Sequence, residues 1–268
     1  MLLIPKLRLG YQNIPKVATT SMFGWLYQVH EQVPTNVYLE GDLKRKFFLQ
    51  QFKCDSKDEI MRAESTYLRV AFTRDPVRRF LSMYGNRVVA KRDLGPDRPN
   101  EQLVLDAGLP FNPQLNELVD ALDDYCAVSK NFLHHTRPQM DFLGLDLSIY
   151  DQLLDISQID QMLELIRIHW RQQGLDEILS TAEEKLPRLQ TGGPKIGLDS
   201  LSRRSFDRLL EFFQNDYESI PTLDQASIKA QFLSENGGTS LYSFDFSQKS
   251  WAEEKNQRSN WKWWDKIN

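Results

Sequence analysis

Short apolar runs alternate with amphipathic stretches through the first half of the chain. The apolar runs predict strands near residues 9–14, 36–40 and 68–73. The stretches between and after them have helical spacing, near residues 20–31, 43–64 (interrupted around CDSKD) and 76–92. Strands that alternate with helices in this way favour a parallel sheet flanked by helices. The pattern therefore predicts an α/β fold with a central parallel sheet.

The second half of the chain has a mostly helical pattern. A fourth strand is predicted at 147–151, followed by a helix that Ser157 caps, with Asp160 three residues later. Residues 199–220 have the spacing of one or two amphipathic helices. We therefore expect a helical carboxyl-terminal part to follow the sheet.

Two loops are predicted from their turn-forming residues. The first, residues 93–113, contains four prolines, and the second is the LPRLQTGGPKIG segment at 186–197. A long loop in a compact domain is usually functional, so we expect residues 93–113 to lie over a substrate.

The end of the chain differs in character from the rest. We divide the chain into a main domain, residues 1–225, and a tail, residues 226–268. The tail places four tryptophans among charged residues: Trp251, Trp261, Trp263 and Trp264. Because large aromatic side chains mostly serve burial, we expect the tail to pack on the domain. Stacking of these indoles on sugar rings or on a partner is the alternative.

Composition excludes several classes of protein. With 268 residues, 41% of them hydrophobic, the chain can bury one large core. A net charge of −4 argues against a general nucleic-acid binder. Cys54 and Cys126 are too few for a metal cluster, so we expect two buried thiols and no metal site. No apolar run approaches the roughly 18 residues of a membrane span, so we predict a cytoplasmic protein.

The segment NIPKVATTSMFGW combines a lysine with hydroxyl side chains where a helix begins. The first N–H groups of a helix have no partners within it, and the helix dipole makes that end positive. Lys16 adds a cation, and Thr19, Thr20 and Ser21 add hydroxyl donors. The segment therefore predicts a P-loop-like anion site, although G-x-x-x-x-G-K-[ST] is absent. Simple helix capping is the alternative interpretation of the hydroxyls.

A second cationic segment follows the strand at 68–73. Arg74 stands at the carboxyl end of the strand, and a helix follows with Arg78 and Ser82 on one polar edge. Its apolar stripe is Val77, Phe80, Leu81, Tyr84 and Val88. Since the carboxyl ends of parallel strands meet at one sheet edge, Arg74 and Lys16 are expected to serve one ligand with two phosphate groups.

Together the two segments resemble those of the sulfotransferases that use 3′-phosphoadenylyl sulfate (PAPS). In that family the first loop holds the 5′-phosphosulfate and the R-D-P-x-x-R segment holds the 3′-phosphate. The resemblance implies that Lys16, Ala18, Thr19, Thr20 and Ser21 bind the phosphosulfate, and that Arg74 and Ser82 bind the 3′-phosphate. Arg79 matches the motif arginine, without an assigned role. The product nucleotide would be 3′,5′-adenosine bisphosphate (PAP).

A third segment, HHTRPQMDFLGLDLSIYDQ, resembles the H-x-x-P-Q run of the membrane-anchored carbohydrate sulfotransferases. His135 fits the motif histidine, and the region of Asp216 and Tyr217 is similar to the last helix of that family. The resemblance covers about residues 10–220 and implies a carbohydrate acceptor. It departs in lacking an amino-terminal anchor, cysteine pairs and the asparagine-serine loop that LQTGGPK replaces. A Golgi location would follow if an anchor had been lost.

The chemistry of sulfuryl transfer assigns roles to these residues. Negative charge grows on the bridging oxygen as the phosphate departs, and Lys16 is placed to stabilise it. His135 is the candidate general base for the acceptor hydroxyl. His134 and Glu40 are the alternatives, whereas His30 and His169 lie in helical patterns and are expected to be structural.

Two other functions fit the same cations. One is a divergent nucleotide-dependent kinase, against which the missing glycines count. The other is a non-catalytic module that binds acidic glycans through these cations. The sequence favours transfer of a sulfuryl group to a carbohydrate hydroxyl.

Overall fold

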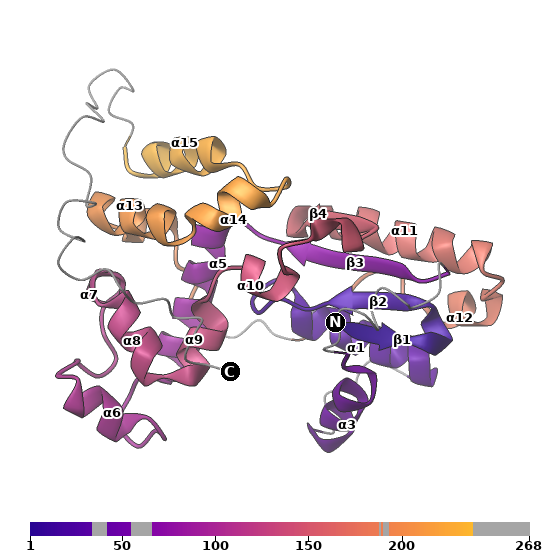
Figure 1. Ribbon diagram of the computed structural model, residues 1–268, viewed down its shortest axis with the longest axis horizontal. Helices are drawn as coiled ribbons and strands as arrows, with labels where there is room; N and C mark the ends of the chain where they lie inside the picture. Colours follow the sequence, from indigo (N-terminus) through magenta and orange to yellow (C-terminus); the bar gives the residue numbers. More distant parts are fainter. Residues whose placement is uncertain (34–41, 55–65, 188, 190–192, 238–268) are drawn as a thin grey trace.

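The computed structural model describes residues 1–33, 42–54, 66–187, 189 and 193–237. One four-stranded sheet has the spatial order β1-β2-β3-β4 (Figure 1). Its strands are β1 (Leu2–Ile4), β2 (Leu9–Gln12), β3 (Leu68–Thr73) and β4 (Gln152–Asp155). Strands β2, β3 and β4 are parallel, and β1 pairs with β2 in the antiparallel direction. The α/β fold predicted from the sequence is confirmed, with an antiparallel edge strand that was not predicted.

The register of the sheet brings three chain segments to one edge. Gln12 of β2 pairs with Ala71 of β3, and Thr73 of β3 pairs with Asp155 of β4. Because these strands are parallel, the segments that follow them all leave from the same side. The turns after β2 and β3, which carry the two cationic motifs, are therefore neighbours.

Helices packed around the sheet share one hydrophobic cluster with it. These are α1 (Thr19–Glu31), α3 (Asp42–Phe52), α10 (Met140–Leu143), α11 (Ile159–Gln172) and α12 (Asp176–Thr181). Trp25 of α1 stacks on Trp170 of α11, with ring centroids 5.3 Å apart and planes at 17°. Both indole N–H groups donate to backbone carbonyls, of Glu183 and Leu7 respectively, so these buried donors are satisfied.

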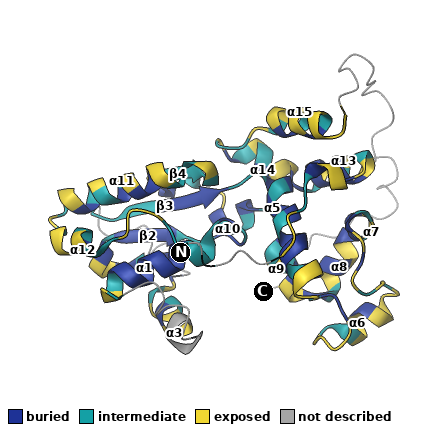
Figure 2. Cartoon of the chain, turned by 180° about the vertical axis from the view of Figure 1, so that it is seen from behind, coloured by how far each residue is buried: buried dark blue, intermediate teal, exposed yellow. Residues whose placement is uncertain are grey.

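A second hydrophobic cluster lies in a helical lobe beside the sheet (Figure 1). It is built around α5 (Pro76–Met83), which continues as a π-helical segment, Tyr84–Ala90. The other helices of this lobe are α6 (Glu101–Asp106), α7 (Leu115–Asp120), α8 (Leu122–Val128), α9 (Lys130–Thr136), α13 (Arg203–Phe212), α14 (Gln214–Ser219) and α15 (Gln225–Glu235). The five residues of the apolar stripe predicted for α5 are all buried here. Figure 2 shows exposed residues on the outer faces of α6, α13 and α15.

Three local predictions were wrong. The strand predicted at 147–151 starts later, because Asp146 accepts from the Ser148 N–H and holds Leu147–Ile149 in a 3-10 turn before β4. Asp155 caps the next turn in place of Ser157, since its carboxylate accepts from the Ser157 N–H at 2.8 Å. The predicted loop 93–113 contains helix α6.

Several predictions fall on residues that the structure does not describe. These are the strand at 36–40 with Glu40, residues 55–64 of the predicted helix, and the four tryptophans of the tail. The described part of the tail is α15, whose Phe232 stacks on Phe206 of α13 with ring centroids 4.0 Å apart. Among the described residues, no helix has both the length and the apolar character that a bilayer crossing demands.

Candidate active site

The turn between β2 and α1 has an unusual backbone. Lys16 and Ala18 both have positive φ, 69° and 49°, in the left-handed region that side chains disfavour. The N-cap residue of α1, Ala18, has no side chain that can cap the helix, and the first helical bond runs from the Met22 N–H to the Ala18 carbonyl. The positive end of this 13-residue helix therefore lacks an N-cap acceptor among the described residues, which suits an anion.

The hydroxyl of Thr19 has a structural role in this turn. It donates to the Ile14 carbonyl at 2.5 Å and contacts the fully buried Tyr11 hydroxyl. Its proton is thus engaged within the protein, so Thr19 offers an incoming phosphate its backbone N–H and not its hydroxyl donor. The capping interpretation does not hold for Thr19, because this hydroxyl bonds to a carbonyl before the helix.

Lys16 lies half-buried among other cations. Burial, together with the positive charges of Arg74, Lys91 and Arg87, lowers its pKa to about 8. Four cationic groups thus meet at the sheet edge, a concentration of positive charge that an anionic ligand would relieve.

Arg74 joins the two motifs. Its Nη1 donates to the carbonyl oxygen of Lys16 at 3.2 Å, although the two residues are 58 positions apart. Burial lowers the pKa of Arg74, while the carboxylates of Asp75 and Asp155 oppose that shift. The expectation that Lys16 and Arg74 meet at one edge is therefore met in the structure.

Gln139, of the third motif, holds the backbone of Arg74. Its side-chain oxygen accepts from the Arg74 N–H at 3.1 Å, and its side-chain nitrogen donates to the Arg74 carbonyl at 2.8 Å. The carboxylate of Asp216 in turn accepts from the backbone N–H groups of Gln139 and Met140, at 2.8 and 2.9 Å. Gln139 and Asp216 are both fully buried. They are positioning residues that the sequence pattern did not assign.

The start of α5 is already capped by the protein itself. Asp75 Oδ1 accepts from the Arg78 N–H at 2.8 Å, and the Tyr217 hydroxyl donates to Asp75 Oδ2 at 2.7 Å. This helix end has no vacancy for an anion, so a phosphate near Arg74 must rely on side chains. Ser82, half-buried on α5 and outside both hydrophobic clusters, remains a candidate.

Arg79 is a structural residue. Its side chain is fully buried and donates to the backbone carbonyls of His135, Thr136 and Arg137, the first two at 3.2 and 3.1 Å. Burial lowers its pKa to about 10, and nearby Asp216 opposes that shift. The motif arginine thus ties α5 to the end of α9, where the two histidines lie.

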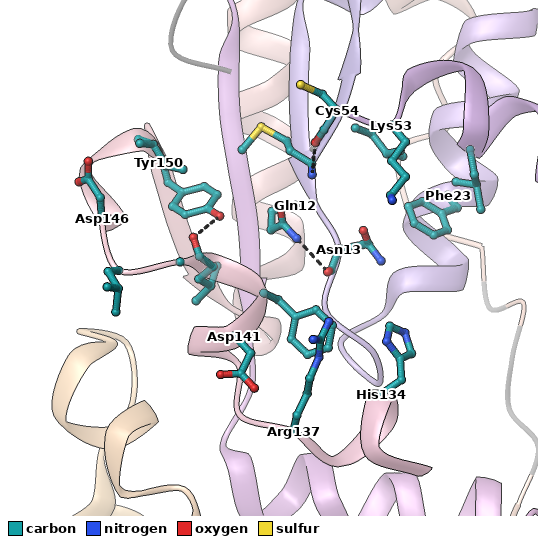
Figure 3. Close-up of a pocket in the computed structure, with 18 residues that line it drawn as sticks. Gln12, Asn13, Phe23, Lys53, Cys54, His134, Arg137, Asp141, Asp146 and Tyr150 are labelled. Atoms are coloured by element: carbon teal, nitrogen blue, oxygen red, sulfur yellow. Dashed lines mark hydrogen bonds between the residues drawn. The ribbon is translucent and has the colours of Figure 1, made fainter. Parts of the chain in front are cut away.

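His134 and His135 lie together in the last turn of α9, with ring centroids 5.3 Å apart. Burial and the charges of Arg87, His134 and Lys16 lower the pKa of His135 to about 3. Its Nδ1 atom is buried and has no hydrogen-bond partner among the residues that the structure describes. His134 is exposed and lines a cavity of about 610 Å³ (Figure 3).

The other two histidines lie elsewhere. His30 contacts Phe48 and Phe52, and its Nδ1 lies 2.7 Å from Glu31 Oε1. His169 Nε2 lies 3.1 Å from the Arg8 carbonyl. Their contacts are with side chains and backbone around the sheet, and their structural role stays a prediction.

Two cations of the site were missed from the sequence. Arg87 belongs to the π-helical segment and Lys91 follows it directly. Arg87 Nε lies 2.5 Å from Asp93 Oδ2, and Asp93 accepts from the Asn131 side chain at 2.8 Å. Arg87 and Lys91 are four residues apart within the helix predicted at 76–92. This spacing was a usable signal, because it places both cations on one helix face.

Gly193 and Pro194, in the described part of the LQTGGPK segment, make a close backbone contact with this helix. A side chain at Gly85 would lie 2.5 Å from the Pro194 carbonyl, and one at Gly193 would lie 2.7 Å from the Gly85 carbonyl. Only glycine allows these two backbones to approach so closely. The loop therefore packs on the turn of helix that follows Ser82.

Comparison with known proteins identifies the family of the chain. A family model described as "Sulfotransferase family" matches residues 1–219. No curated protein matches the chain, and neither does any solved structure. Because the match spans most of the chain and includes both cationic turns, the chain belongs to the sulfotransferase family.

Proposed function

We propose that the chain transfers a sulfuryl group from PAPS to a hydroxyl of a carbohydrate acceptor. The observation that supports this proposal best is the hydrogen bond between the Arg74 guanidinium and the Lys16 carbonyl. It brings the uncapped start of α1 and the R-D-P-x-x-R segment to one edge, as a ligand with phosphate groups at two positions requires.

The two ends of the donor would be held by different means. The backbone N–H groups at the start of α1, with Lys16 and Ser21, would bind the phosphosulfate through charge and the helix dipole. At the other end, Arg74 and Ser82 would bind the 3′-phosphate through side chains, because Asp75 occupies the helix end there.

Lys16 is the proposed electrostatic catalyst. As the bond between sulfur and the bridging oxygen breaks and the bond to the acceptor oxygen forms, negative charge accumulates on the bridging oxygen. A cation held in a half-buried turn stabilises that charge more than one in water would.

His135 is the proposed general base, which takes the proton of the acceptor hydroxyl. Its imidazole is neutral at pH 7, as a base must be, because burial and neighbouring cations lower its pKa to about 3. Binding of a polyanionic donor beside Lys16, Arg87 and Lys91 would offset those charges and raise the pKa of His135 toward neutrality. The donor would thereby strengthen the base.

Substitution of each histidine separates the base from its neighbour. We expect His135→Ala to lower turnover at least 100-fold while PAP binding, measured by calorimetry, is retained. His134→Ala is the comparison variant, and turnover is measured at saturating acceptor because His134 lines the cavity one residue away. A larger loss of turnover in His134→Ala than in His135→Ala would assign the base to His134.

The function itself is tested by transfer of radiolabelled sulfate from PAPS to a panel of oligosaccharides. Labelled product with a sugar acceptor is the expected result. Phosphate transfer from ATP to the same panel would indicate a kinase. Binding of sulfated oligosaccharides without any transfer would indicate a glycan-binding module.

A further inference from the structure

The cavity beside the proposed donor site has a polar end. Asn13 directly precedes the turn that carries Lys16, and His134, Arg137 and Asp141 approach from α9 and α10 (Figure 3). The Arg137 guanidinium lies over the Phe142 ring, 4.1 Å from its centroid. Arg137 and Asp141 both line this end of the cavity, so a guanidinium donor and a carboxylate acceptor lie there together. Such groups suit the hydroxyls of a sugar.

The opposite end of the cavity is apolar. Cys54 and Tyr150 lie there, away from His134 and Arg137 in Figure 3, and Ile149 adjoins them in the lining. The polar atoms of this end are used within the protein: the Tyr150 hydroxyl donates to the Leu143 carbonyl at 2.9 Å. Asp146, on the same side, has its carboxylate bonded to Ser148. Lys53 also lines the cavity beside Cys54, so this end offers a ligand carbon and sulfur surface with one lysine at its edge.

Leu145 extends the apolar end to the rim. It lines the cavity, yet its side chain is 94% exposed, the highest value among the large hydrophobic residues described. Gly144 before it has a φ of +84°, a conformation that favours glycine and turns the chain outward at this point. A ligand that extends out of the cavity along this rim would cover the Leu145 side chain.

We infer that this cavity is the acceptor site and that it takes an amphiphilic acceptor, a sugar whose anomeric position carries an apolar group. The hydroxylated head would lie at the polar end, next to His134 and the Lys16 turn, and the apolar group would lie against Tyr150, Ile149 and Leu145. This inference rests on the proposed function for the identity of the site. An alkyl chain and an aryl ring share the required chemistry.

The test compares matched glycosides that differ only in the apolar group. Methyl, octyl and phenyl β-glycosides of glucose, galactose and N-acetylglucosamine are titrated by calorimetry into the PAP-bound protein, below the concentration at which octyl glycosides form micelles. We expect at least one sugar to bind at least tenfold more tightly as its octyl or phenyl glycoside than as its methyl glycoside. The octyl and phenyl arms distinguish a lipid-like from an aromatic group.

Variants locate the effect in the cavity. Leu145→Ser should reduce the gain from the apolar group several-fold and leave binding of the methyl glycoside unchanged. Leu105→Ser is the matched control, since Leu105 is 50% exposed on α6 and does not line the cavity. Equal binding of methyl and octyl glycosides, or a gain that Leu145→Ser does not affect, would overturn the inference.

The two proposals can fail separately. Sulfate transfer with equal kcat/KM for methyl and octyl acceptors would preserve the proposed function and reject the amphiphilic acceptor. Conversely, a gain in binding that depends on Leu145, in a protein that transfers no sulfate, would preserve the cavity assignment and reject the reaction.

Discussion

The turns after β2 and β3 both connect a parallel strand to a helix, but they differ in backbone conformation and in helix capping. The turn after β2 holds Lys16 and Ala18 at positive φ and leaves α1 without a side-chain cap. In the turn after β3, Pro76 starts α5 and Asp75 caps it in an ordinary conformation. We call the strained turn after β2 the open turn, because the N-cap residue of α1 has no capping side chain there. We call the turn after β3, together with the start of α5, the closed turn, because Asp75 caps it.

The difference suits the proposed ligand, whose two ends would be bound in different ways at one sheet edge. An uncapped helix start binds through backbone N–H groups, whose position depends on the turn. A capped helix start leaves recognition to side chains such as Arg74. Backbone strain tends to be kept where it serves function, and the strained turn here carries the proposed catalytic lysine.

The largest expected effect concerns the closed turn. Arg79→Ala should lower the free energy of unfolding by about 3–5 kcal/mol, because it leaves three backbone carbonyls of the α9 end without their buried donor. Urea denaturation measures the loss.

Two neighbouring arginines serve as controls for that variant. Arg78 is 36% exposed and pairs with Glu235, so Arg78→Ala should cost at most about 1 kcal/mol. Arg74→Ala should cost about as little, from one hydrogen bond, yet weaken PAP binding at least tenfold. If Arg79→Ala were as stable as Arg78→Ala, Arg79 would not have the structural role assigned to it.

In the open turn, Lys16→Ala should lower turnover about 100-fold or more at saturating donor, the scale of losing one electrostatic stabiliser. Lys16→Arg keeps the charge and should retain part of the activity. Single-turnover sulfate transfer measures both. An unchanged rate in Lys16→Ala would remove this lysine from the mechanism.

A smaller effect is expected on the affinity for PAP, which should depend on pH through the same residue. Lys16 has a pKa of about 8 in the ligand-free protein, and a bound phosphate favours the protonated amine. Affinity should therefore be highest below pH 8 and fall by up to about tenfold per pH unit as the pH rises above it. Lys16→Arg, which stays protonated, should abolish this fall. A fall that persists in Lys16→Arg would assign the titration to another group.

The smallest effect tests the strain itself. Ala18→Gly should raise the free energy of unfolding by about 0.5–1 kcal/mol, because glycine adopts a φ of 49° without the cost that alanine bears. Ala230, exposed within α15, is the matched control, and Ala230→Gly should lower stability by about 1 kcal/mol. Thermal unfolding compares them. The same loss in both variants would show that the turn is not strained.

Much of the fold could be predicted because its elements have clear local signals. The strands at 9–12 and 68–73, and helix α1, follow from apolar runs and helical spacing. Helix α6 was missed because prolines on both sides of it dominated the pattern. Strand β4 was displaced because capping by Asp146 and Asp155, which depends on side-chain geometry, fixed the boundaries.

The residues of the candidate site also divide into those with a local sequence signal and those without one. Lys16 and Arg74 were found because cations at strand ends have a local signature. Gln139 and Asp216 could not be assigned roles, since their contacts with Arg74 and with each other span 65 to 77 positions of sequence. The engagement of the Thr19 hydroxyl with Ile14 depends on a backbone conformation that the composition of the turn does not reveal.

The three carbonyl contacts of Arg79 have a consequence for motion. They fasten the segment with His135 to α5, the helix that carries Ser82 and continues into the π-helical segment with Arg87. Loss of that fastening during each reaction cycle would expose a buried charge. We therefore expect α5 and the end of α9 to move as one body if the proposed donor site opens and closes.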